Sequence, residues 1–212
     1  MVTGSDVRDF VEALLSVDRR AAQRIFERAR AEATVIDVVE GLIVPALETV
    51  GDDWQQGAAS LSQVYMGARI CHTLVESAML PQEAVRDVQP RLAVAVLGDG
   101  HSLGKQLVLL SLRSGGYRVL DLGAQRTPEE LVAACVEHDI QILFISVLML
   151  PAALRVAELR AALADAGRLT KLVVGGAPFR FDANLWREVG ADSFGYSASH
   201  ATRIVAQMGG AA

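Results

Sequence analysis

Cysteine and positive charge are both scarce in this sequence. It holds two cysteines, Cys71 and Cys135, and 20 Lys and Arg residues against 25 Asp and Glu, so its formal net charge is −5. Two cysteines far apart in helix-like stretches exclude a disulfide framework and predict buried, reduced thiols, as in a cytoplasmic protein. An acidic chain without a basic patch argues against nucleic acid as a partner, because phosphate backbones are normally met by an excess of Lys and Arg.

Long hydrophobic runs are also missing. No apolar run reaches the roughly 18 to 20 residues needed to cross a bilayer. The first residues are polar and acidic, without the apolar segment of a secretory signal. We therefore expect neither a membrane span nor a signal peptide. Apolar residues make up 51% of the 212 residues, which suffices for real cores, and the length fits one small domain followed by a medium-sized one.

The first part of the chain has the apolar spacing of helices. The pattern predicts four of them, from about Val7 to Leu15, Asp18 to Ala29, Val35 to Val50 and Ser60 to Leu80. Pro45 predicts a kink in the third, because its ring removes one hydrogen bond of the helix, and we expect Gly51 to Gly57 to interrupt the helical pattern. Short connections predict a four-helix bundle over residues 1–85, and the polar stretch from Pro81 to Pro90 is the expected linker.

From residue 91 onward, short unbroken apolar runs alternate with helix-like stretches. The runs are Leu92–Leu97, Tyr117–Leu122, Ile142–Ser146, Lys171–Gly176 and one that begins near Ala191. Strands that are buried on both faces have this composition. Helices are expected after each run, including one from Pro151 to about Ala166 and one near Asn184 to Val189. Residues 91–212 are therefore predicted to form a doubly wound, five-stranded parallel sheet of the Rossmann-like type.

Three unusual loops follow strands of this predicted sheet. They are Gly98-Asp99-Gly100-His101-Ser102-Leu103-Gly104-Lys105, then Ser146-Val147-Leu148, then Gly175-Gly176. Open parallel sheets bind ligands beyond the carboxyl ends of their strands, so all three loops are expected at the same edge. The sequence predicts a binding site there.

Several interpretations of the first loop are possible. Gly98, Gly100 and Gly104 imitate a dinucleotide-binding fingerprint, with Asp121 as the acid for a ribose, but the spacing of the last two glycines is one residue too long. In a purely structural interpretation, His101 caps the following helix and Asp99 satisfies its imidazole. Zinc is poorly supported, since no second His or Cys has ligand spacing to His101. Alternatively, His101 is one axial ligand of a cofactor's metal, and Asp99 fixes its tautomer.

The three loops together resemble a known family. Asp99-Gly100-His101-Ser102-Leu103-Gly104, Ser146-Val147-Leu148 and Gly175-Gly176 match, in order and spacing, the signature of cobalamin-binding corrinoid proteins. This group includes the corrinoid subunits of methyltransferases and the cobalamin module of methionine synthase. The resemblance extends to the helical part, where Val50-Gly51-Asp52-Asp53-Trp54-Gln55-Gln56-Gly57 is similar to the turn that precedes the last helix of the family's cap.

The resemblance implies a cofactor and a role for each matching residue. Cobalamin would bind base-off, with its nucleotide tail in the sheet domain and His101 as the lower ligand of cobalt, held by Asp99. Ser146 would meet the tail, and the glycines would leave room for it because they lack a Cβ atom. Trp54, Tyr65 or Met66 would shield the upper face of cobalt. The cofactor-binding residues implied in this way are Asp99, Gly100, His101, Ser102, Leu103, Gly104, Ser146, Leu148, Gly175, Gly176, Trp54 and Tyr65.

One departure concerns the proton relay. In methionine synthase the His-Asp pair continues to a serine, and Ala152 occupies that position here. The resemblance therefore implies a relay that is shortened, or that is completed by another group or by water.

The resemblance favours a corrinoid carrier without catalytic activity of its own. It would carry a methyl group on cobalt between methyltransferase partners, with methylcobalamin as the favoured form. The alternative is a cobalamin-dependent sensor, possibly responsive to light and using adenosylcobalamin, that acts through a signalling partner. A third hypothesis is the cobalamin subunit of a mutase, but the helical cap argues against it, since those subunits resemble the sheet domain alone.

Overall fold

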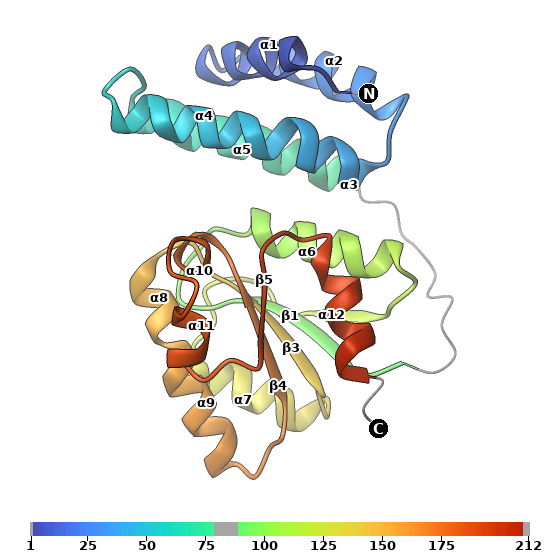
Figure 1. Cartoon of the computed structure of the whole chain (residues 1–212), viewed down its shortest axis with the longest axis vertical. Helices are drawn as coiled ribbons and strands as arrows, with labels where there is room; N and C mark the ends of the chain where they lie inside the picture. Colours follow the sequence, from blue (N-terminus) through green and yellow to red (C-terminus); the bar gives the residue numbers. More distant parts are fainter. Residues whose placement is uncertain (1, 79–88, 210–212) are drawn as a thin grey trace. The chain divides into compact units, whose positions relative to one another are not determined.

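The computed structural model describes residues 2–78 and 89–209, and the chain divides into two compact units, Met1–Leu80 and Pro81–Ala212. Most of the predicted linker, residues 81–88, lies outside the described residues. Figure 1 shows a first unit made of helices and a second unit in which helices cover a parallel sheet. This arrangement confirms the predicted fold of a helical bundle followed by a doubly wound sheet.

The helical unit begins with short helices that have strong N-terminal caps. Thr3, Asp18 and Thr34 each accept a hydrogen bond from a backbone N–H of the first turn that follows, which satisfies donors that the helix leaves unpaired. Apolar side chains from the bundle's helices fill the core, among them Phe10, Leu14, Phe26, Leu42 and Val75. The helices are α1 (Gly4–Leu15), α2 (Arg19–Arg30), α3 (Val35–Val38), η1 (Val39–Ile43), α4 (Val44–Gln55) and α5 (Leu61–Ala78).

The third predicted helix differs from its expectation in two ways. A π-helical turn, η1, ends at Ile43, shortly before Pro45. The hydrogen-bond pattern of the helix therefore changes in the turn before Pro45, which has no backbone N–H to donate. The predicted interruption at Gly51 is wrong, because α4 continues through Gly51 to Gln55. A Cβ atom at Gly51 would meet nothing within 4 Å. The helix ends instead before Gly57, whose φ of +77° suits a glycine.

Both cysteines are fully buried, one in each unit. Burial raises the pKa of the Cys71 thiol to about 12 and also raises the pKa of Cys135. Because the thiolate is the reactive form, we expect neither residue to react with DTNB within minutes at pH 8 in the native chain, and both to react in urea. Rapid labelling of the native chain would contradict the burial described here.

The sheet has the strand order β2-β1-β3-β4-β5, and every neighbouring pair is parallel. Its carboxyl ends are aligned in register, because Ser146 pairs with Val96 and Gly175, and Gly175 pairs with Gly195. Chain order reverses between β1 and β3, so the helices that follow these two strands lie on opposite faces of the sheet. The strands are β1 (Leu92–Val96), β2 (Val119–Asp121), β3 (Ile142–Ser146), β4 (Lys171–Gly175) and β5 (Ser193–Gly195).

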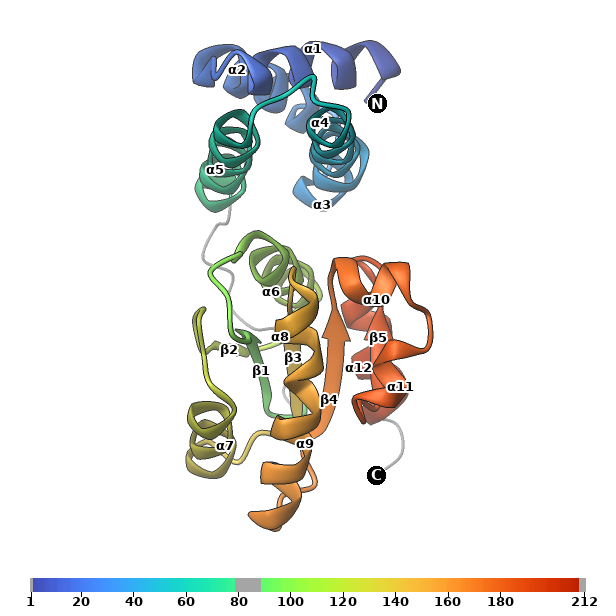
Figure 2. The ribbon, with the colours of Figure 1, turned by 90° about the vertical axis from the view of Figure 1, so that its left-hand side faces the viewer.

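Helices cover both faces of the sheet (Figures 1 and 2). On one face, α6 (Leu103–Ser114) and α12 (His200–Gly209) pack against the strands and each other. On the other, α7 (Pro128–Glu137) and α9 (Val156–Asp165) close over a core that includes Ala95, Leu143 and Val174. The alternation of side chains along each strand therefore divides the apolar runs between two cores.

Three short helices complete the sheet unit: α8 (Leu150–Leu154), α10 (Ala177–Phe181) and α11 (Leu185–Glu188). The helix predicted from Pro151 to Ala166 is two helices, α8 and α9, which meet at Arg155. The sequence did not predict α10, because five residues are too few to show a helical period. Within the described part of the chain, no helix is both long and apolar enough to cross a membrane.

Candidate functional site

The structure brings the loops after β1 and β3 together at the carboxyl edge of the sheet. The backbone N–H of Leu148, in the second loop, donates a hydrogen bond to Asp99 Oδ2 in the first, at 3.2 Å. The third loop joins them, since the Val147 N–H donates to the Gly175 carbonyl at 3.0 Å. The three motif loops, defined here as residues 98–105, 146–148 and 175–176, therefore form one continuous rim at the point where the strand order reverses.

Asp99 and His101 form a compact pair within the first loop. Asp99 Oδ1 accepts the His101 backbone N–H at 2.9 Å and lies 3.2 Å from His101 Nδ1. The Asp99 side chain is only 10% exposed, whereas that of His101 is 56% exposed. An Nδ1–H that donates to Asp99 leaves the lone pair of Nε2 on the opposite side of the ring. The pair thus presents an accessible nitrogen ligand whose orientation is fixed from behind.

A loop that sequence reasoning did not single out holds the main chain of Asp99. The Gln125 N–H donates to the Asp99 carbonyl at 2.9 Å, and the Gly98 N–H donates to the Arg126 carbonyl at 3.0 Å. Gln125 has a φ of +58°, which is unusual for a residue other than glycine. These bonds fasten residues 122–126, the β2 loop, along the back of the Asp99 segment.

Three glycines of the site lie where a Cβ atom would make close contacts, with a side chain at Gly104 and with backbone at Gly175 and Gly176. A Cβ atom at Gly104 would lie 2.7 Å from Ser146 Oγ, so the first turn of α6 is packed directly against the end of β3. Gly176 has a φ of +122°, and a Cβ atom there would lie 1.8 Å from the Val147 carbonyl oxygen. At Gly175 the nearest atom would be the Gly195 carbonyl oxygen at 3.2 Å. The packing itself therefore explains these three glycines, and a further role beside a ligand stays a prediction.

The remaining predicted site residues fall into two groups. Gly100 and Ser102 lie in the turn between Asp99 and α6, and Leu103 is the first residue of that helix. Leu148 is exposed next to the Asp99 carboxylate. Trp54 and Tyr65 belong to the helical unit, where α4 and α5 expose their side chains. Ala152, at the position of the missing relay serine, is buried, and its Cβ would contact a Cβ placed on Gly98 at 3.5 Å.

The structure argues against the dinucleotide interpretation at Asp121. Lys105 Nζ lies 2.6 and 2.5 Å from the two oxygens of the Asp121 carboxylate, and the Gly123 N–H donates to Oδ1 at 2.9 Å. The Asp121 carboxylate therefore already has a cation and a backbone donor as partners within the fold, without a ribose. Asp121, the acid of the dinucleotide interpretation that the glycine spacing already disfavours, is part of the scaffold.

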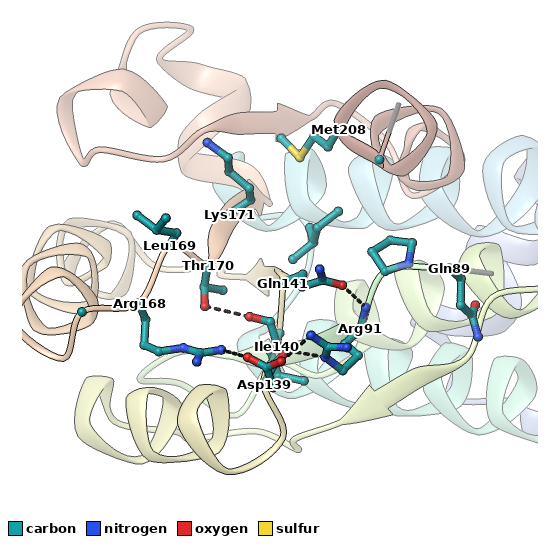
Figure 3. Close-up of a pocket in the computed structure, with 14 residues that line it drawn as sticks. Gln89, Arg91, Asp139, Ile140, Gln141, Arg168, Leu169, Thr170, Lys171 and Met208 are labelled. Atoms are coloured by element: carbon teal, nitrogen blue, oxygen red, sulfur yellow. Dashed lines mark hydrogen bonds and ion pairs between the residues drawn. The ribbon is translucent and has the colours of Figure 1, made fainter. Parts of the chain in front are cut away.

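A separate hollow of about 660 Å³ lies at the opposite edge of the sheet, at the amino ends of β1, β3 and β4. Figure 3 shows that Arg91 and Arg168 converge on Asp139 there, and both guanidinium groups pair with its carboxylate. The hydrogen bond from Arg168 lowers the pKa of the Asp139 carboxyl. None of the residues of the motif loops lines this hollow. Lys171, which also lines the hollow, pairs with Asp192 outside it. Each charged side chain of the lining thus has an ion-pair partner in the protein, which is typical of a structural surface network.

The rim at the carboxyl edge fits a cofactor whose metal ion is already held in a macrocycle. Within residues 2–78 and 89–209, no group of three or more His, Cys, Asp or Glu side chains could hold a metal ion. A bare ion would need several protein ligands, whereas a metal already held in a macrocycle needs one axial nitrogen. The exposed His101 ring, backed by Asp99, could supply that single ligand.

Comparison with known proteins gives matches to both units. One family model described as a B12 binding domain matches residues 91–205, and a second with the same description matches residues 7–78. The chain is 29% identical to trimethylamine corrinoid protein 1 of Methanosarcina acetivorans, over 89% of each chain. It is 28% identical to dimethylamine corrinoid protein 3 of the same organism, over 92% of each.

A solved structure has the same fold. The monomethylamine corrinoid protein of Methanosarcina barkeri superposes with a TM-score of 0.85 at 22% identity, covering 97% of this chain and 100% of that one. At this level of identity the similarity extends to the fold, including both the helical unit and the sheet unit.

Proposed function

Because the chain belongs to the B12-binding domain family, we propose that it is the corrinoid protein of a methyltransferase system and that His101 is the lower axial ligand of cobalt. The observation that carries this proposal is the Asp99–His101 pair, whose exposed ring stands at the reversal point of the sheet with Nδ1 directed at a buried carboxylate. In the proposal, Asp99 holds the ring and raises the basicity of the ligating nitrogen.

When bound, the corrinoid would supply a cobalt centre that accepts and releases a methyl group. The chain's own residues bind and orient it. The Leu148 N–H fixes Asp99 Oδ2, so the carboxylate cannot rotate away from His101. We further propose that the nucleotide tail lies against Ser146, Gly104, Gly175 and Gly176, with Gly100, Ser102 and Leu103 completing the loop beside it. The Ser146 hydroxyl is the group there that can rotate to meet a polar atom of the tail.

The relatives support a carrier that works with methyltransferase partners. The corrinoid proteins matched here are named for trimethylamine, dimethylamine and monomethylamine. The chain covers about nine-tenths of the first two, so the similarity involves whole proteins and not one shared domain. We propose methylcobalamin as the working form, with one partner that methylates the cofactor and another that removes the methyl group.

Reconstitution tests the carrier against the sensor. The protein is loaded in the dark with methylcobalamin or adenosylcobalamin, and its absorption spectrum and mass are recorded before and after illumination. A carrier should take up methylcobalamin and lose the methyl group only when a corrinoid-dependent methyltransferase and its acceptor are added. Selective uptake of adenosylcobalamin, followed by a light-driven change in oligomeric state, would overturn the carrier proposal in favour of the sensor.

Trp54 and Tyr65 are proposed as the contacts that the helical unit makes with the cofactor. Truncation of either to alanine should weaken cobalamin binding by about 3- to 10-fold, the range expected for one aromatic contact. Leu169→Ala is the matched control, because Leu169 is also a large exposed side chain but lines the hollow at the opposite sheet edge. Isothermal titration of the three variants is the measurement, and equal affinities would exclude both aromatic residues.

A further inference from the structure

We propose that Lys105 and Asp121 are a positioning pair for the loop that carries His101. The inference rests on the proposed function, because it concerns how the ligand loop is held. Lys105 is the first residue after the Asp99–Gly104 motif, and Asp121 ends β2. The pair therefore joins the first turn of α6, on one side of the ligand loop, to the β2 loop on the other.

The burial of Lys105 shows that the pair is part of the scaffold. The Lys105 side chain is 7% exposed, and its Nζ lies 2.6 and 2.5 Å from the two oxygens of the Asp121 carboxylate. A lysine is almost never buried without a partner, because removal of its charge from water is costly. The sequence has two lysines, Lys105 and Lys171, and otherwise uses arginine for its cations. A compact ammonium group thus occupies a position where a planar guanidinium would differ in size and shape.

Hydrogen bonds connect Asp121 to the ligand loop in two short steps. Asp121 Oδ1 accepts the Gly123 N–H at 2.9 Å, which fixes the start of the β2 loop. Two residues further, the Gln125 N–H donates to the Asp99 carbonyl at 2.9 Å, and the Arg126 carbonyl accepts the Gly98 N–H at 3.0 Å. Lys105 therefore acts on Asp99, and through Asp99 on His101, without touching either side chain.

Loss of the pair should loosen the β2 loop while leaving the sheet intact. The strand pairing between β1 and β3 and the Leu148–Asp99 bond do not involve Lys105 or Asp121. In a Lys105→Met variant, Asp121 loses its cation and the Gly123 end of the loop loses its fixed acceptor. Backbone bonds still join this end of the loop to β1, from the Leu122 N–H to the Val94 carbonyl and from the Val96 N–H to the Gly123 carbonyl. The Asp99 carbonyl is then held by a loop that has lost its side-chain anchor.

Hydrogen exchange in the cofactor-free protein is the direct test. In Lys105→Met, protection of the Gln125 and Gly98 amides should fall by about 10-fold relative to wild type, with the Ile145 amide in β3 unchanged. Lys171→Met is the matched control, since Lys171 pairs with Asp192 at the opposite edge of the sheet. If the single variant does not fold, the double variant Lys105→Met/Asp121→Asn replaces it in the experiment, because it leaves no unpaired carboxylate. The same loss of protection at the Gln125 and Gly98 amides is expected.

Cobalamin binding provides the second measurement. The dissociation constant of Lys105→Met should rise by about 10-fold, the usual scale for a partner behind a metal ligand, while Lys171→Met binds like wild type. Unchanged exchange at Gln125 and Gly98 would overturn the inference. If exchange changes but wild type shows no nitrogen coordination to cobalt, the proposed function fails and the positioning of Asp99 still stands.

Discussion

Replacement of His101 by alanine is expected to abolish nitrogen coordination below cobalt and to weaken cobalamin binding by at least about 10-fold. The reason is geometric. The His101 ring is an exposed imidazole at the rim of the motif loops, and its Nδ1 lies against Asp99, which leaves Nε2 as the nitrogen proposed to coordinate cobalt. The absorption spectrum of the loaded variant should be that of cobalamin with water, and not nitrogen, in the lower position.

The matched control for this variant is His138→Ala. His138 is also a half-exposed histidine beside a carboxylate of the same unit, at the end of α7 and outside the motif loops. Its removal should change neither the spectrum nor the affinity. A His101→Ala protein whose spectrum still shows nitrogen ligation would exclude His101 as the ligand. An altered His138→Ala spectrum would mean that His138 contributes to cobalt coordination, and the assignment of His101 would be wrong.

A Gly176→Ala variant should lose about 3 kcal/mol of stability in the sheet unit. The φ of +122° at Gly176 is a conformation that side chains rarely adopt, and the new Cβ atom would lie 1.8 Å from the Val147 carbonyl oxygen. Because that neighbour is backbone, no change of rotamer relieves the clash. Val147 also lies between Ser146 and Leu148, so any shift of its carbonyl disturbs the second motif loop.

Gly104→Ala is the control for this prediction within the same unit. There the new Cβ atom would meet a serine hydroxyl, which can rotate, and alanine in a helix offsets part of the cost. We expect a change below about 1 kcal/mol. Urea unfolding of the apoprotein, followed by Trp186 fluorescence in a Trp54→Phe background, reports on the sheet unit alone. Equal midpoints for the two variants would contradict the described conformation of Gly176.

The sequence predicted the three central strands well, because β1, β3 and β4 each contain an unbroken apolar run. The edge strands β2 and β5 are only three residues long and are less apolar. Ile142–Ser146 was predicted with its observed bounds. The errors concern local features, namely a glycine within a helix and a very short helix. Gly51 was expected to interrupt the third helix, but a glycine that faces open space weakens a helix only slightly. The five-residue helix α10 is shorter than any periodic signal.

The candidate site was predictable to the extent that it consists of strand ends. Parallel register places Val96, Ser146 and Gly175 side by side, so the loops that follow them had to meet. The contribution of Gln125 was not predictable, because it acts through its backbone N–H. Every residue type except proline has this group, so the sequence does not indicate the bond. Lys105 and Asp121 were both noticed, but their pairing joins a helix and a strand end and shows only in three dimensions.

The most direct test of the central claim is electron paramagnetic resonance of the protein loaded with cob(II)alamin, prepared once with natural-abundance histidine and once with ¹⁵N-histidine. We predict that each cobalt line is split into three by one ¹⁴N nucleus in the unlabelled protein and into two in the labelled protein. The same labelled sample of His138→Ala should be indistinguishable from wild type. A three-line pattern that persists after labelling would mean that the cofactor's own base occupies the lower position, and the assignment of His101 would be wrong.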